Sequence, residues 1–83
     1  MKKNIIGDNI RKARKAANPP ITQADLVARL QLKGTEIDQS MISRIEKGER
    51  LVTDYELKAI AEALKVSLEW LIAGDKDSST KSK

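Results

Sequence analysis

Apolar side chains recur every three to four residues along most of the chain, which is the spacing of one face of an α-helix. Short polar stretches that contain proline, glycine or a helix-capping residue interrupt this pattern four times. We find no strand signal and no internal repeat. The pattern therefore predicts an all-α fold with five helices.

Two prolines separate the first two predicted helices. The first helix ends before Pro19 and Pro20, because proline disfavours a helical conformation in the residue before it. The second begins at Thr22, a favourable N-cap, and its helical character fades between Leu32 and Gly34. Their expected core-facing residues are Ile6, Ile10, Ala13, Ala17, Leu26, Val27 and Leu30. The expected outward-facing residues of the first helix are Asp8, Arg11, Lys12 and Lys15.

Each of the last three predicted helices begins after a favourable N-cap residue. The N-caps are Asp38, Thr53 and Ser67. Thr53 and Glu56 also have the T-x-x-E spacing of a capping box. The third helix runs to Lys47 before Gly48, and the fifth ends at Gly74. The expected core-facing residues are Met41, Ile42, Ile45, Leu57, Ile60, Ala61, Leu64, Leu68, Trp70 and Leu71.

Length and composition indicate one small domain without a metal or a cofactor. Eighty-three residues support one modest hydrophobic core. We expect residues 1–74 to form this domain and residues 75–83, which contain no apolar side chain, to be a disordered polar tail. Cysteine and histidine are both absent, so the commonest zinc ligands and the commonest general base are missing. These absences argue against an enzyme.

The charge of the chain favours a polyanionic partner. Lysine and arginine number 16 against 12 acidic residues, which gives a net charge of +4. This excess is weak evidence by itself, because many soluble proteins are equally basic. Tyr55 and Trp70 are the only aromatic residues, which argues against a platform for single-stranded nucleic acid. No apolar run has membrane-spanning length and no signal-peptide core follows the first lysines, so we expect a cytoplasmic protein without a membrane partner.

The third predicted helix has two chemically different sides. At about 100° per residue, Met41, Ile42 and Ile45 fall on one side. An opposite arc of about 140°, which holds no acidic residue, contains Gln39, Ser40, Ser43, Arg44 and Lys47. In the major groove, glutamine can pair with adenine, arginine with guanine, and serine with either. The arc fits a base-reading surface, and it equally fits an ordinary solvated helix face.

The second predicted helix begins with residues that suit a phosphate group. Its N-terminus would present backbone N–H groups and the positive end of the helix dipole. The side chain of Gln23 adds an amide donor at this end. Simple N-capping also explains Thr22, and the two roles are compatible because the phosphate contact would use Gln23.

Three stretches of the chain, in order, form a more specific pattern. They are Ile21-Thr22-Gln23, Ile42-Ser43-Arg44-Ile45-Glu46-Lys47-Gly48 and Ala61-Glu62-Ala63-Leu64-Lys65-Val66-Ser67-Leu68-Glu69-Trp70-Leu71. With the helical patterning from Ile6 to Gly74, they make the chain resemble the Cro/repressor-type helix-turn-helix proteins, also called the xenobiotic-response-element class. The resemblance implies a compact, lambda-repressor-like bundle of five helices whose second and third helices form the DNA-reading unit.

The resemblance also implies roles for individual residues. The base-reading positions of the family are occupied here by Gln39, Ser40, Ser43 and Arg44. Gln23, Lys47 and Arg50 match residues that contact DNA phosphates. Arg14 and Glu46 match a pair that forms a structural salt bridge between the first and third helices, so we expect neither to contact DNA.

The turn of the predicted helix-turn-helix departs from the family pattern. Residues 31–37 stand where relatives have a much tighter turn, and Gln31 replaces the usual turn glycine. The geometry is retained if Leu32 and Ile37 pack onto the core and Gly34 supplies a sharp bend.

The leading hypothesis is a bacterial or phage transcriptional repressor that occupies an operator in double-stranded DNA. A domain of this size makes few base contacts, so we expect a homodimer at least on DNA. The fifth helix or the loop before the fourth would supply the dimer contact. The cluster Trp70, Leu71 and Ile72 is a candidate, with ordinary core packing as its alternative. The rival hypothesis is a protein-binding adaptor or antitoxin of the same fold, whose partner would be a toxin or another regulator. An antirepressor is a further possible partner of the repressor.

Overall fold

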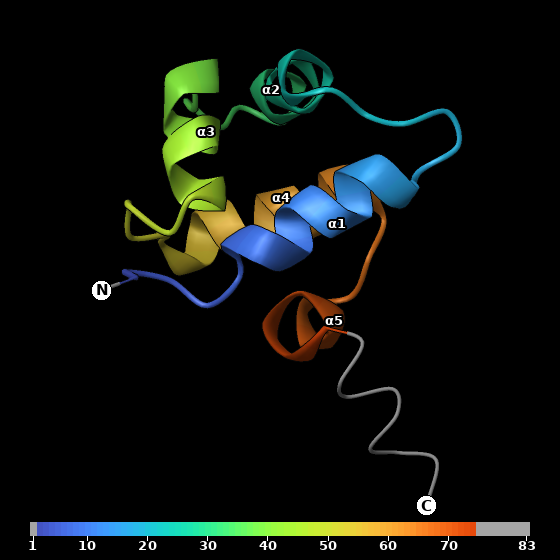
Figure 1. Cartoon of the computed structure of the whole chain (residues 1–83). Coiled ribbons are helices and arrows are strands. Elements are labelled where there is room, and N and C mark those ends of the chain that lie inside the picture. The colour runs from blue at the N-terminus through green and yellow to red at the C-terminus, as the bar shows by residue number, and fades with distance from the viewer. Residues whose placement is uncertain (1, 75–83) are drawn as a thin grey trace, which may run out of the picture.

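Five helices make up residues 2–74, the part of the chain that the computed structural model describes (Figure 1). They are α1 (Gly7–Ala16), α2 (Gln23–Leu32), α3 (Gln39–Glu46), α4 (Asp54–Leu64) and α5 (Leu68–Ala73). No strand forms in these residues, so the predicted all-α fold with five helices is confirmed. The predicted polar tail, residues 75–83, lies outside the described residues.

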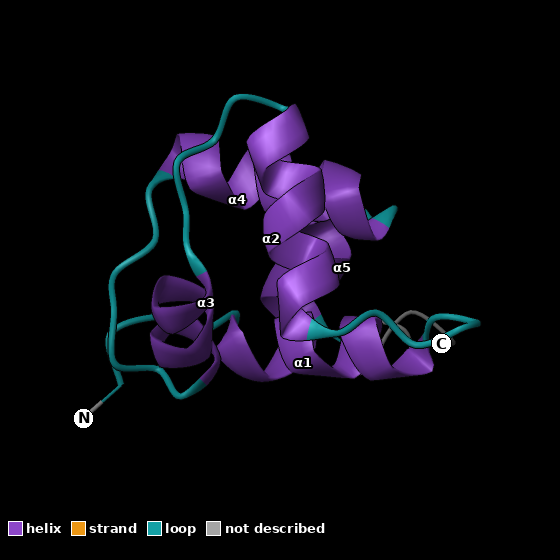
Figure 2. Cartoon of the chain, turned by 90° about the horizontal axis from the view of Figure 1, so that it is seen from above, coloured by secondary structure: helices purple, strands orange, loops and turns teal. Residues whose placement is uncertain are grey.

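The helices are arranged around α1 and α4, which lie one behind the other in Figure 1. α1 contacts α3, α4 and α5, and α4 also contacts α2 and α5. α2 and α3 contact each other on one side of α1, whereas α5 lies on the other side (Figure 1). The view from above in Figure 2 shows α3 beside α1 and α2, with no helix over its outer side.

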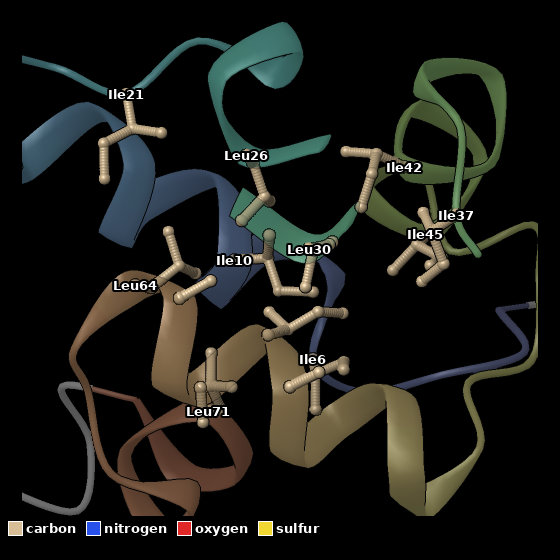
Figure 3. Packing of buried hydrophobic residues seen from close by; sticks show 14 residues of the cluster. Ile6, Ile10, Ile21, Leu26, Leu30, Ile37, Ile42, Ile45, Leu64 and Leu71 are labelled. Atoms are coloured by element: carbon tan, nitrogen blue, oxygen red, sulfur yellow. The ribbon is translucent and has the colours of Figure 1, made fainter. Parts of the chain in front are cut away.

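One hydrophobic core joins the five helices (Figure 3). Eight of its side chains are less than 2% exposed, namely Ile10, Leu26, Leu30, Ile37, Ile42, Ile45, Ile60 and Leu71. Burial of an aliphatic side chain of this size stabilises a fold by about 1.5–3 kcal/mol. Because Ile42 and Ile45 of α3 belong to this set, the core determines which side of α3 faces outwards.

Side-chain caps define where four of the helices begin. The predicted N-caps Thr22, Asp38, Thr53 and Ser67 are confirmed, since each accepts a hydrogen bond of 2.8–3.1 Å from the backbone N–H three residues later. Thr53 and Glu56 form the predicted capping box. A second box, which the sequence analysis missed, joins Thr22 and Asp25. Hydrogen bonds from Thr22, first of all from its backbone N–H, lower the pKa of the Asp25 carboxyl.

The long turn between α2 and α3 packs on the core through Ile37 and not through Leu32. Gly34 supplies the predicted bend at a φ of +83°, a conformation that favours glycine, and Ile37 is buried at 1% exposure. The condition that Leu32 packs onto the core is not met, because its side chain is 89% exposed. α2 continues through Gln31, and Leu32 then lies about 200° around the helix from the buried Leu30. Its side chain therefore faces away from the core.

In α5, two predicted core contacts are confirmed and one is wrong. Leu71 is completely buried and Trp70 is partly buried, as predicted. Leu68, which was predicted to face the core, is 42% exposed, and Ile72 is 49% exposed. Residues four apart share one stripe of a helix, so Leu68 and Ile72 lie together beside the buried Leu71. Core packing thus accounts fully for only one residue of the predicted cluster Trp70, Leu71 and Ile72.

The N-terminal segment ties the start of α1 to the end of α3. Asn4 donates hydrogen bonds to the carbonyls of Ile45 and Arg50 at 3.1 and 2.9 Å, and it accepts one from the Gly7 N–H at 2.8 Å. At Gly7 the two helices approach so closely that a Cβ would collide with the Ile45 carbonyl oxygen. This junction needs a residue without a side chain.

We predict that Gly7→Ala destabilises the protein, although alanine normally stabilises a helix relative to glycine by about 0.5–1 kcal/mol. The added methyl group must push α1 from α3, which should lower the free energy of unfolding by about 1–3 kcal/mol in urea denaturation. Ala16→Gly, at the exposed end of α1, is the control and should show the ordinary preference for alanine. A Gly7→Ala protein at least as stable as the wild type would contradict the close contact.

Candidate nucleic-acid interface

The outward side of α3 presents polar and basic side chains. Gln39, Ser40, Arg44 and Lys47 are exposed, and Ser43 is partly exposed. The only carboxylate of α3, Glu46, points inwards and is buried. The two predicted sides of this helix are therefore present. The outward side can donate hydrogen bonds and has no acidic group of its own to repel an anion.

A buried ion pair attaches α3 to α1. The Nε and Nη2 atoms of Arg14 donate to the two carboxylate oxygens of Glu46 at 2.6 and 2.8 Å, and Nη1 donates to the Ile21 carbonyl at 3.0 Å. The two side chains are only 9% and 5% exposed. Hydrogen bonding to Glu46 raises the pKa of Arg14 above its ordinary value, against a smaller opposing effect of burial. The predicted structural salt bridge is confirmed, and through Ile21 it also reaches the start of α2.

Gln23 adds its side chain to this pair. Its Nε2 atom donates to Oε1 of Glu46 at 3.1 Å, which turns the amide nitrogen towards the carboxylate. The amide nitrogen carries two hydrogens, so one remains for another acceptor. Gln23 is also the first residue of α2, where backbone N–H groups have no partner within the helix. Glu46 thereby orients a side chain that was predicted to contact phosphate.

A hollow of about 320 Å³ opens where α1, α2 and α3 meet. It is lined by Arg11, Arg14, Lys15, Gln23, Ser43, Glu46 and Lys47. Four of these residues are cationic and one is a carboxylate, and that carboxylate is already bound by Arg14 and Gln23. Arg11 and Lys15 face outwards, as predicted from the sequence, which indicated no role for either of them. Their position next to Arg14 was the available signal, because the predicted bridge to Glu46 brings this part of α1 to α3.

The structure gives Arg50 a different environment from Lys47. The guanidinium of Arg50 binds both carboxylate oxygens of Glu56 at 2.9 and 3.1 Å and the Leu51 carbonyl at 3.0 Å. Its side chain is 22% exposed. This pair ties the loop after α3 to α4. A phosphate contact by Arg50 stays a prediction, and it would have to compete with Glu56.

The packed pair of α2 and α3 with an exposed polar side on α3 is the architecture of a helix-turn-helix DNA-binding domain. The sequence agrees, because the family model of the Cro/C1-type helix-turn-helix matches residues 10–71. The chain therefore belongs to this family of DNA-binding regulators. No curated protein and no solved structure shows a significant match to the chain. Within residues 2–74, no helix is long and apolar enough to cross a membrane.

We predict that Arg14→Ala lowers the free energy of unfolding by about 3–5 kcal/mol, because Glu46 would remain buried without its partner. The control is Lys33→Ala, which breaks the exposed pair of Lys33 and Glu62 and should cost less than about 1 kcal/mol. Urea denaturation of both variants measures the difference. If the two losses were equal, the Arg14 pair would not have the structural role described.

The pair of Arg50 and Glu56 predicts a specific loss of stability in acid. Hydrogen bonding to Arg50 lowers the pKa of Glu56 below its ordinary value of 4.5. The ionised carboxylate thus stabilises the fold at neutral pH, and this contribution is lost as the pH falls from about 4.5 through the lowered pKa. Glu56→Gln, which retains a side chain suited to the capping box, should lower the Tm at neutral pH and flatten its decline in acid.

Thermal unfolding followed by circular dichroism across this pH range tests the prediction. Glu36→Gln, in the exposed turn before α3, removes one carboxylate without breaking a capping box and serves as the control. It should leave the acid dependence of the Tm close to that of the wild type. An unchanged acid dependence in Glu56→Gln would show that the pair does not stabilise the fold.

Proposed function

We propose that this protein is a sequence-specific regulator of transcription that binds an operator in double-stranded DNA through the major groove, most simply as a repressor. The observation that carries the proposal is the outward side of α3, which is polar, basic and free of carboxylates. Ile42 and Ile45 hold this helix on the core, and the Arg14–Glu46 pair holds it against α1. A helix held in this way can present side chains to base edges without the cost of ordering its backbone at the moment of binding.

The base contacts in this proposal come from four residues. Gln39 is the first residue of α3, and the N-terminal part of a recognition helix reaches deepest into the major groove. Its amide suits adenine, which offers an acceptor and a donor side by side. Arg44 lies more than a turn further along and suits guanine. Ser40 and Ser43, between them on the outward side, can bind either a donor or an acceptor.

Phosphate contacts would position α3 in the groove. Lys47 is exposed directly after α3, and the amide of Gln23 retains one N–H beside it in the same hollow. These two residues line the same hollow as Ser43 of α3, so they suit the backbone that borders the groove being read. Arg50 would join them only by sharing its guanidinium with Glu56.

A second copy of the chain on an adjacent half-site completes the proposal. One recognition helix contacts few base pairs, and two copies about one helical turn apart provide the specificity an operator needs. Exposed apolar side chains support a contact between copies in two places. These are Leu68 and Ile72 on α5, and Leu51 and Tyr55 around the beginning of α4. A bacterial or phage protein acting in the cytoplasm fits this role.

We predict that Gln39→Ala loses base discrimination. A binding site is first selected from a pool of random duplexes with the wild-type protein. On this site the variant should lose about 1–3 kcal/mol, roughly 5- to 150-fold in affinity, and should tolerate more bases at one position of each half-site. Its affinity for unrelated duplexes should barely change, because the lost contact is to a base edge.

Lys47→Ala is the matched control for Gln39→Ala, since both residues are exposed at the ends of α3. It should weaken binding to all duplexes alike and lower the salt dependence by about one unit on a log–log plot. If both variants kept the wild-type preference and affinity, α3 would not be the recognition helix. A protein-binding adaptor or antitoxin would then be the better hypothesis.

A further inference from the structure

Arg11 and Lys15 form a basic pair on α1 that neither the core nor the proposed base contacts explain. The two residues are four apart, which places them on one stripe of the helix, and both are exposed. Within residues 2–74 neither of them forms an ion pair. Arg14, between them in sequence, is by contrast buried against Glu46. The stripe therefore runs along the edge of α1 next to the buried pair.

Both side chains line the hollow between α1, α2 and α3, together with Lys47. Three exposed cations thus surround one opening, and the only carboxylate in it is occupied by Arg14 and Gln23. Like charges gathered in this way repel one another, and a bound anion would relieve the repulsion. The hollow is a structural candidate for an anion site.

We propose that this hollow binds a phosphate of the DNA backbone, with Arg11 and Lys15 as contacts, so that the DNA interface extends from α2 and α3 onto α1. The inference rests on the proposed function and deepens it, because it names a part of the DNA that α3 does not read.

The donors around the hollow fit the chemistry of a phosphodiester. The planar guanidinium of Arg11 can bind two phosphate oxygens at once, and Lys15 adds a point charge. The second amide N–H of Gln23 and the hydroxyl of Ser43 line the same hollow as neutral donors. The volume of about 320 Å³ is many times the roughly 10–15 Å³ that a cavity needs to hold one water. A phosphate group with its hydration fits this space.

The position of the hollow identifies the phosphate as one that borders the groove read by α3. Ser43 and Lys47 belong to α3 and its C-terminal end, and they line the hollow directly beside the exposed Arg44. The Ile21 N–H donates to the Arg14 carbonyl at 2.9 Å, which holds the segment just before α2 against α1, and α3 contacts both α1 and α2. A DNA strand that passes along the outward side of α3 would therefore meet the edge of α1. An acidic segment of another protein also suits the charges, but none of the described apolar residues lines the hollow to anchor such a segment.

The double variant Arg11→Gln/Lys15→Gln tests the inference in the full-length chain. Both residues are exposed, so the variant should retain the Tm of the wild type. We expect its affinity for the selected duplex and for an unrelated duplex to fall by the same factor, roughly 3- to 20-fold. The slope of log affinity against log salt should become shallower by about 0.9 for each phosphate contact that is lost. Base preference should not change, and one ethylation-interference position per half-site should disappear.

The double variant Lys12→Gln/Lys58→Gln is the matched control. It removes the same charge from two exposed lysines, one of them on α1, and neither lines the hollow. Its affinity and salt slope should stay near those of the wild type, and an equal loss in the two double variants would overturn the proposal by showing only a general charge effect. Unchanged DNA binding in Arg11→Gln/Lys15→Gln would also overturn it and would leave an acidic protein segment as the occupant. Absence of DNA binding by the wild type would instead contradict the proposed function itself.

Discussion

The ion pair between Arg14 and Glu46 fixes the relation of three helices in this small fold. Removing two charges from water is costly, and the cost is offset here because the guanidinium and the carboxylate both have further partners in Ile21 and Gln23. Every buried side-chain polar atom among the described residues is hydrogen-bonded. An apolar pair of the same volume could provide similar stability, but it would not impose directional bonds. The pair thus contributes a defined orientation of α3 against α1 and the start of α2.

The five helices and their caps could be predicted because these features are local. Each of the four N-caps is a Thr, Asp or Ser that stands before a helical pattern in the sequence. The capping box at Thr22 was missed because the third residue of its helix is Asp25 instead of a glutamate. Leu68, which was wrongly predicted to face the core, and Leu32, which was considered for the packing of the turn, both lie at helix ends. Whether an end residue is buried depends on what packs against it from distant parts of the chain, and periodicity contains no information on that.

The candidate interface, too, could be predicted from the sequence only in part. The outward side of α3 follows from helical spacing, and the bridge of Arg14 to Glu46 follows from the family resemblance. The ion-pair partners of individual charged residues cannot be predicted in this way, because they depend on tertiary distances. Arg50 and Lys47 lie three residues apart with the same charge, yet Glu56 of α4 captures the first and leaves the second exposed. Likewise, only the folded chain brings α1 alongside Lys47.

The turn between α2 and α3 contacts the core through Ile37, whereas α3 itself is held by Ile42, Ile45 and Glu46. The orientation of α3 therefore depends on these buried contacts and not on the exposed part of the turn. Insertions and deletions on the exposed stretch around Gly34 would change the loop without rotating the helix that follows. In evolutionary terms this connection is a tolerant position, where a lineage can drift in sequence and length while the orientation of α3 in the fold is inherited unchanged.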